Sequence, residues 1–180
     1  VSALAVASLC MGAPAAFADP GDPYKVGGVN QENTSNKALI NPDAATRLSI
    51  HKYLGAPTGQ ANNGTEQAIT GRDPLVGVNF DVYRVVGVDL TTNAGWTAAT
   101  ALSGHQITAA EIAAKAITLG GTTYTLSGPS TVTTAAGGLA TFDGAVGLYL
   151  VNENLATSGT ITADGETVEK ASITPSAPFL

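Results

Sequence analysis

The sequence predicts an all-β fold, an antiparallel β-sandwich with one short inserted helix. Glycine is abundant at 21 residues, while only 12% of the residues are charged and 6% are aromatic. Short runs of β-branched and alternating residues recur between glycine-containing turns, a pattern typical of an antiparallel sandwich or barrel. At 180 residues the chain is long enough for one domain with a substantial core, plus short extensions.

The N-terminal segment predicts an incomplete secretory signal peptide over residues 1–18. It carries no charge, is apolar, and ends in the small-residue motif AFA, so we expect cleavage between Ala18 and Asp19. A permanent membrane anchor is the weaker interpretation, because the stretch is barely long enough to span a bilayer. Cys10, the only cysteine, lies in this segment. The mature domain would therefore contain no disulfide and need another source of stability.

An extended lead-in is expected over residues 19–46, which are rich in Asp, Pro, Asn and Gly. The sandwich domain is predicted over 47–180. Its first strand is expected at 47–54, and a long polar loop with turn residues follows at 55–74.

A long, half-buried strand is predicted over residues 75–90. Alternation places three apolar side chains on one face and three more polar ones on the other. The two sets are Val78, Phe80 and Val82, and Asn79, Asp81 and Tyr83.

One short helix is predicted after this strand. Thr108 and Glu111 have the spacing of a capping box, alanine-rich helix formers follow, and Gly120-Gly121 ends the pattern. Short strands then recur at 122–127, 130–134, 139–142, 147–153, 159–163 and 166–173. We expect the domain to be truncated before its last strand.

Several function classes lack support in the sequence. The net charge is −6 with no basic run, so the electrostatic footprint of a nucleic-acid binder is missing. His51 and His105 are isolated from other metal ligands, so no metal or cofactor is expected. Ser103-Gly104-His105 has no acid partner that would make it a catalytic triad, and a secreted hydrolase therefore ranks far below the other hypotheses.

Two charged residues lie where the alternation predicts apolar ones. Lys52 shares a strand face with Leu48 and Ile50, and Glu153 shares one with Tyr149 and Val151. In the simpler interpretation, the lysine reaches water near a strand end and the glutamate lies just past a buried strand. Patterning alone favours this interpretation.

The other interpretation joins the two residues in one reaction. A lysine buried among aliphatic side chains loses its preference for the charged form, and the neutral amine is a nucleophile. If an Asn carboxamide lay against Lys52, the carboxyl group of Glu153 could shuttle protons and an isopeptide bond would form with release of ammonia. Such a bond would replace the missing disulfides.

Four segments in order resemble the N-terminal domain of the sortase-assembled shaft pilins of Gram-positive bacteria. They are "DAATRLSIHKYLGAP" (43–57), "PLVGVNFDVYRVVGVDLTTNAGW" (74–96), "TVTTAAGGLATFDGAVGLYLVNE" (131–153) and "ITPSAPFL" (173–180). The third segment resembles the hairpin that leads to the family's Y-x-L/V-x-E motif. The fourth is similar to the run that precedes the pilin motif.

The resemblance implies an immunoglobulin-like sandwich of the collagen-adhesin B (CnaB) type. Lys52 matches the first-strand lysine of internal isopeptide bonds, and Glu153 matches the glutamate of the Y-x-L/V-x-E motif. The partner Asn is then expected beyond Leu180, because Asn152 and Asn154 alternate onto the opposite face. The polymerising lysine and the sorting signal are also expected outside this chain, and Lys170 lacks the sequence context of that lysine.

The leading functional hypothesis is a structural, non-enzymatic subunit of a covalently polymerised pilus that supports adhesion. Its expected partners are neighbouring pilin subunits, a sortase and a host surface protein or glycan, and its expected location is a pilus anchored to the cell wall. The alternative is a stalk or tip domain of a surface adhesin that binds a host protein or glycan. In that case the insertion at 91–121, with Trp96, is the expected contact surface, although Trp96 is as well placed to cap the core.

Overall fold

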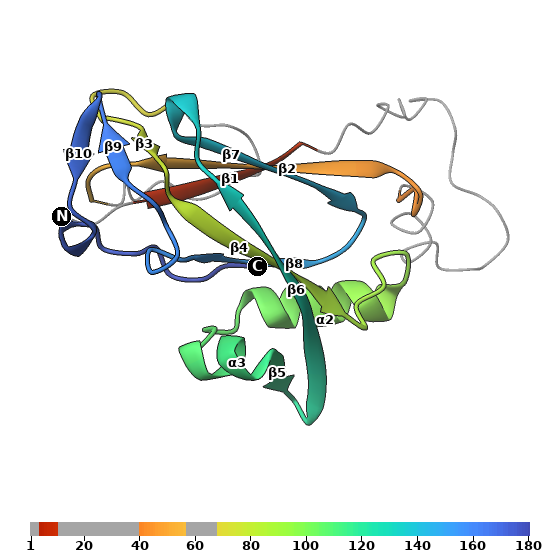
Figure 1. Cartoon of the computed structure of the whole chain (residues 1–180). Coiled ribbons are helices and arrows are strands. Elements are labelled where there is room, and N and C mark those ends of the chain that lie inside the picture. The colour runs from red at the N-terminus through yellow and green to blue at the C-terminus, as the bar shows by residue number, and fades with distance from the viewer. Residues whose placement is uncertain (1–3, 11–39, 57–67) are drawn as a thin grey trace, which may run out of the picture.

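The computed structural model describes residues 4–10, 40–56 and 68–180 (Figure 1). Within these residues the strands form a sheet in the order β1-β2-β7, a sheet in the order β5-β6-β4-β8, and a small sheet in the order β10-β9-β3. The predicted all-β antiparallel sandwich is confirmed. Most of the predicted lead-in at 19–46 lies outside the described residues.

The first layer is built around β2 (Ala45–Tyr53), which lies between β1 (Leu4–Cys10) and β7 (Leu139–Ala145). Both neighbours run antiparallel to β2. Strand β2 begins two residues earlier and ends one residue earlier than the sequence predicts. Strand β1 falls within the predicted signal peptide, whose cleavage stays a prediction.

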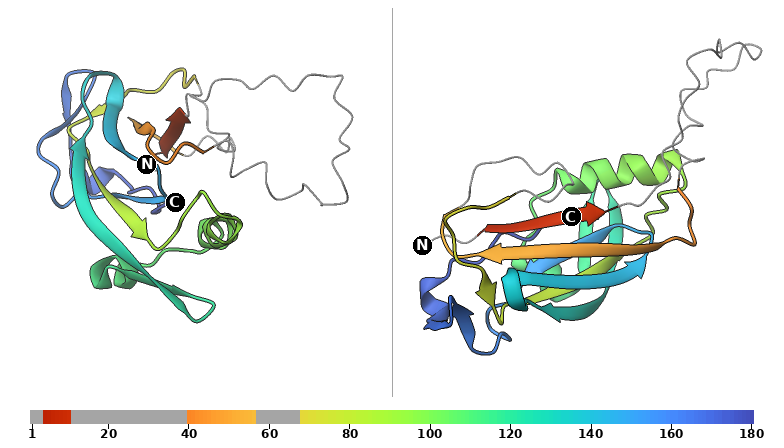
Figure 2. Two further views of the ribbon diagram at one scale, coloured as in Figure 1. Left: turned by 90° about the vertical axis from the view of Figure 1, so that its right-hand side faces the viewer. Right: turned by 90° about the horizontal axis from the view of Figure 1, so that it is seen from above.

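The second layer contains β5 (Ala116–Leu119), β6 (Thr122–Thr133), β4 (Asn79–Val86) and β8 (Tyr149–Glu153), all antiparallel. The pairing of β4 with β6 shifts register between Val82 and Arg84. Figure 1 shows this layer facing the first one, and Figure 2 shows the two layers from the side and from above.

The main hydrophobic core lies between the two layers. Buried aliphatic and aromatic side chains from β2, β7, β4 and β8 meet there: Ile50, Ala140, Phe80, Val82 and Val151. Burial of this apolar surface is the main favourable contribution to folding. The chain thus supplies one core from strands that are far apart in its sequence.

The small third sheet covers one end of the sandwich. It contains β3 (Leu75–Val76), β9 (Ile161–Ala163) and β10 (Glu166–Val168). Gly77 separates β3 from β4 with φ of 90°, and a Cβ atom at this position would lie 2.3 Å from the carbonyl oxygen of Thr160. Only glycine fits this close approach. The predicted single strand over 75–90 is therefore wrong, because the chain is interrupted at Gly77 and forms two strands, β3 and β4.

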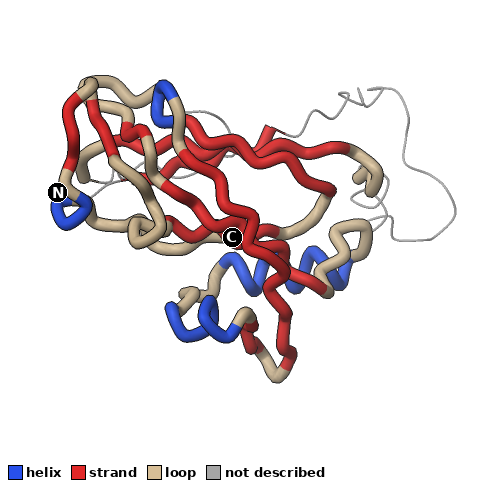
Figure 3. Tube along the Cα trace, in the orientation of Figure 1, coloured by secondary structure: helices blue, strands red, loops and turns tan. Residues whose placement is uncertain are grey.

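Two α-helices cover the outer face of the second layer, α2 (Asn93–Ser103) and α3 (Ala109–Ala114), as Figures 1 and 3 show. Helix α3 begins at the predicted Thr108 capping box. Helix α2 was not predicted, and it buries Ala99 and Leu102 against a second core cluster on β4, β6 and β8. Tyr83, expected on the exposed face, is consequently only 6% exposed.

Short 3₁₀ turns complete the described chain at Ala136–Gly138 and Lys170–Ser172. After the second turn, the last residues pass along the open edge of β8. There Val151 and Phe179 exchange backbone hydrogen bonds of 2.8 and 3.1 Å. The C-terminal segment (residues 173–180) therefore enters the second layer next to Glu153.

Candidate functional site

Lys52 lies in the sandwich core. Its side chain has no exposed surface, and the residue is among the largest fully buried ones, as is Ile50 on the same face of β2. The predicted alternation along the strand is therefore confirmed at this position. The simpler interpretation, in which the ammonium group reaches water, does not hold.

Glu153 is the direct partner of Lys52. It is the last residue of β8, pairs with Phe80 of β4, and its side chain is also fully buried. The Lys52 Nζ atom donates a hydrogen bond of 2.6 Å to Glu153 Oε2. The two residues that the sequence singled out thus meet across the two layers, although they are 101 positions apart.

Ser176 completes the cluster from the C-terminal segment, and no pattern in the sequence marks it as part of a site. Lys52 Nζ donates to its Oγ atom at 3.2 Å, and its backbone N–H donates to Glu153 Oε2 at 2.8 Å. Pro175 and Pro178 flank this serine and favour extended backbone around it. That local signal predicts an extended segment but does not reveal which strand edge it joins.

Burial weakens the preference of Lys52 for its charged form. Desolvation lowers the pKa of the Lys52 amine, and the hydrogen bond and charge of Glu153 oppose this effect only in part. Glu153 Oε1 is buried and finds no hydrogen-bond partner among the described residues. A buried carboxyl oxygen without a hydrogen-bond donor lowers the stability of the fold. The glutamate of this cluster therefore lacks one hydrogen bond that it could accept.

The neighbouring asparagines do not face Lys52. The side-chain amide of Asn154 donates to Asp81 Oδ2 at 2.7 Å, and Asn152 lies opposite Asp81 in the pairing of β8 with β4. Both belong to the other face of the strand, as the alternation predicts. The isopeptide bond, and the expectation that its Asn partner lies beyond Leu180, stay predictions.

The two histidines and the other candidate positions do not form a second site among the described residues. Among the described residues no group of three His, Cys, Asp or Glu side chains could hold a metal ion. The ring of His51 stacks on Tyr53 with centroids 6.5 Å apart, and His105 Nε2 lies 2.8 Å from Glu111 Oε1. The expected cleavage site at Ala18 and Asp19 lies outside the described residues. No helix in the described part of the chain is long and apolar enough to cross a membrane.

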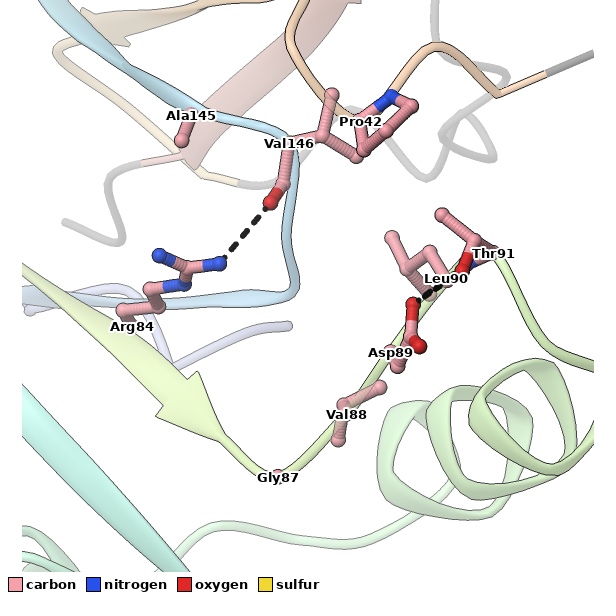
Figure 4. Close-up of a pocket in the computed structure, with 9 residues that line it drawn as sticks. All are labelled: Pro42, Arg84, Gly87, Val88, Asp89, Leu90, Thr91, Ala145 and Val146. Carbon is pink, nitrogen blue, oxygen red and sulfur yellow. Dashed lines mark hydrogen bonds between the residues drawn. The ribbon is translucent and has the colours of Figure 1, made fainter.

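A hollow of about 320 Å³ lies next to the start of the 91–121 insertion, from which only Thr91 lines it (Figure 4). Its polar groups already have partners: Arg84 Nη2 donates to the Val146 carbonyl at 3.2 Å, and Asp89 Oδ1 accepts from Thr91. Trp96 packs against the second core cluster. This tryptophan therefore packs on the core and does not line the hollow, which is a candidate contact surface. Its lining residues are Pro42, Arg84, Gly87, Val88, Asp89, Leu90, Thr91, Ala145 and Val146.

Comparison with known proteins identifies relatives over most of the chain. The family described as "Gram-positive pilin subunit D1, N-terminal domain" matches residues 43–180. "Fimbrial subunit type 1" of Actinomyces viscosus is 33% identical over 91% of this chain, and "Fimbrial subunit type 2" of Actinomyces naeslundii is 36% identical over 41% of it. The chain spans only 27% and 14% of the lengths of these two relatives.

One solved structure is also similar, the pilin–signal peptide complex of SpaA from Corynebacterium diphtheriae. It is 34% identical, with a TM-score of 0.43, and the match covers 66% of this chain and 76% of that chain.

Proposed function

Because this chain belongs to the family of Gram-positive pilin subunit N-terminal (D1) domains, we propose that it is the N-terminal part of a pilus shaft subunit that a sortase joins to its neighbours. The family is structural and not enzymatic, and its members are exported components of the cell-surface pilus. The observation that carries the proposal is the family match over residues 43–180, which spans the sandwich from β2 onward.

Among the described residues, three lysines bear on where the polymerising lysine lies, while Lys25 and Lys37 fall outside the described residues. Lys52 is buried, Lys115 Nζ donates to the carbonyl of Gly128, and Lys170 Nζ donates to the carbonyl of Ser158. A sortase needs a lysine amine that can reach the acyl-enzyme as a free nucleophile. Burial keeps the Lys52 amine from such a reaction, and the other two amines are hydrogen-bonded to backbone carbonyls.

Reconstitution with a pilus-type sortase tests the proposal. The complete subunit, encoded by the full reading frame, should form a ladder of covalent multimers on a denaturing gel. Lys115→Arg and Lys170→Arg in that subunit should leave the ladder unchanged, because neither lysine is the expected nucleophile. A complete subunit that forms no multimers with any sortase encoded by the same organism would contradict the proposal.

A second candidate function is a stalk or tip domain that binds a host protein or glycan and so supports adhesion. The hollow beside the insertion is the observation that favours it, since it combines an arginine, a carboxylate and apolar lining. Ala145 is exposed at its rim, so Ala145→Trp should fill it. Binding of the monomeric domain to a glycan array or matrix protein, abolished by this variant, would support the adhesin function over the shaft function.

A further inference from the structure

An arginine lies where the alternation along β4 predicts an apolar side chain. Phe80 and Val82 belong to the main core, and Arg84, two positions further along, is on the same face of the strand. The pairing of β4 with β6 shifts register just before Arg84, and a bulge of this kind often redirects a side chain. Arg84 is exposed and lines the hollow. The end of the sandwich therefore opens around a cation and is not closed by apolar packing.

The guanidinium group of Arg84 is held in place and has further donors available. Its Nη2 atom donates to the carbonyl of Val146 at 3.2 Å. A Cβ atom at residue 147 would lie 3.1 Å from Nε, so Gly147 leaves the space that this group fills. Among the described residues Arg84 takes part in no ion pair. Because a guanidinium carries its donors in a planar fork that matches a carboxylate, the hollow presents a pre-oriented cation to an anionic ligand.

The opposite side of the hollow carries a hydrogen-bond acceptor. Asp89 lies there, and its Oδ1 atom accepts from the N–H and the hydroxyl of Thr91 at 2.9 and 2.6 Å (Figure 4). These contacts orient the carboxylate, which can accept further hydrogen bonds because it offers about four lone-pair sites. A ligand that suits both sides has an anionic group at one end and hydrogen-bond donors, such as hydroxyl groups, at the other.

Apolar side chains line the space between the two charged groups. Val88, Leu90 and Val146 are among them. Ligand pockets usually combine such lining with a few polar groups that fix the orientation of the ligand. The volume of about 320 Å³ is near the lower end of the usual range of roughly 300 to 1,000 Å³. The hollow therefore suits a single ring better than an extended chain.

We propose that this hollow binds a sugar acid, that is, one sugar ring that carries a carboxylate. Arg84 binds the carboxylate through charge-assisted hydrogen bonds, Asp89 accepts from ring hydroxyl groups, and the apolar lining contacts the C–H groups of the ring. An acidic peptide side chain fits less well, because it has no hydroxyl hydrogen to donate to Asp89. The inference deepens the adhesin function, the second candidate above, and rests on it, since a surface glycan would supply the sugar acid.

Titration of the chain of residues 1–180 with four free probes, followed by amide chemical shifts in NMR spectra, tests the inference. Glucuronate and N-acetylneuraminate are sugar acids, glucose differs from glucuronate in lacking the carboxylate, and N-acetylglutamate α-amide represents an acidic peptide side chain. At least one sugar acid should shift the amide signals of residues 87–91 and 146. Glucose and the glutamate probe should bind about ten-fold or more weakly, which is the usual contribution of a hydrogen bond to a charged group.

Three variants separate the effect of charge from that of shape. Arg84→Gln should reduce the affinity for the sugar acid to that for glucose, whereas Ala145→Trp should abolish the binding of both because it fills the hollow. Arg47→Gln is the matched control, since it removes an exposed arginine that pairs with Asp143 in the first layer. This control should bind the sugar acid as the unchanged chain does. If Arg84→Gln fails to fold, as judged by circular dichroism, the comparison with glucose and Ala145→Trp still decides the outcome.

The inference and the adhesin function fail in different ways. No shift with either sugar acid, equal binding of glucuronate and glucose, tighter binding of the glutamate probe, or full affinity in a folded Arg84→Gln variant would each overturn the inference. The adhesin function has its own readout, the binding to a glycan array or matrix protein described above. A chain that binds such a ligand but no sugar acid retains that function and refutes the inference. A chain that binds the free sugar acid but no host ligand supports the inference and refutes the adhesin function.

Discussion

At the residue scale, removing one member of the buried pair of Lys52 and Glu153 should destabilise the fold strongly, whereas replacing both with apolar residues should change its stability little. Both side chains are fully buried, and removing either partner leaves the other group without its counter-charge. Removing both charges together avoids that penalty. The pair is therefore better understood as a determinant of which strands meet than as a large net source of stability.

We predict that Lys52→Ala lowers the free energy of unfolding by about 3–5 kcal/mol, the usual cost of leaving a buried partner uncompensated. The double change Lys52→Met with Glu153→Leu should recover most of that loss. Urea unfolding, followed by fluorescence or circular dichroism, measures both. Arg47→Ala is the matched control, because Arg47 pairs with Asp143 at 2.7 Å in an exposed pair and should matter little. Equal losses in the single and double variants would contradict this account.

At the element scale, a carboxylate controls the start of helix α3. Glu111 Oε2 accepts from the backbone N–H and the hydroxyl of Thr108, and its Oε1 atom contacts His105. The backbone hydrogen bond from Thr108 is the largest cause that lowers the pKa of Glu111 from 4.5 to about 2, followed by the hydrogen bonds of His105 and Thr108. The capping box thus depends on the ionised form.

We predict that the stabilising effect of Glu111 is complete above pH 4.5 and is lost as the pH falls through about 2. The folded state holds the Glu111 proton less tightly than the unfolded state, so stability from this group rises with pH in that window. Thermal melts of the natural chain and of Glu111→Gln should differ at pH 7 and converge near pH 2. Glu166→Gln removes an exposed carboxylate from a hairpin and is the control. A difference that is constant over this range would exclude the proposed role.

Two glycines of the same helical insertion should respond in opposite ways to alanine. At Gly95, in the first turn of α2, a Cβ atom would lie 1.8 Å from the carbonyl oxygen of Asp89. At Gly104, the C-cap of the same helix, the nearest atom would be 3.7 Å away and φ is −84°. We predict that Gly95→Ala lowers the melting temperature clearly, whereas Gly104→Ala leaves it unchanged or raises it. Similar losses at both positions would show that the contact with Asp89 is relieved by backbone movement.

The same elements show what the sequence can and cannot predict. The capping box of α3 and the alternation that places Lys52 inside are local patterns, and both are found in the structure. The start of α2 has only Thr92 as an N-cap and a glycine in its first turn, so its local helix signal is weak. Gly77 divides a predicted strand because of a contact with Thr160. Ser176 was missed for a similar reason, since its partners are brought to it only by tertiary packing.

At the scale of the whole molecule, the pairing of β1 with β2 links export to the architecture of the sandwich. Strand β1 pairs with β2 from Leu4 opposite Tyr53 to Cys10 opposite Arg47. If cleavage occurs after Ala18, as the sequence predicts, the mature chain lacks β1. Strand β2 then changes from a central strand to an edge strand, with a row of unpaired backbone groups that can accept another strand.

Hydrogen exchange can detect this change at single residues. In an antiparallel sheet, successive residues of a central strand bond alternately to its two neighbours. We therefore predict that a chain beginning at Asp19 loses amide protection at every second residue between Arg47 and His51, where β2 pairs with both neighbours, while the residues in between stay protected by β7. The chain of residues 1–180 should protect both sets. A peptide of residues 4–10 added to the shorter chain should restore the lost set, since the new edge has the register to accept it. If both sets remain protected in the chain beginning at Asp19, another segment covers this edge, and β1 is not what makes β2 a central strand.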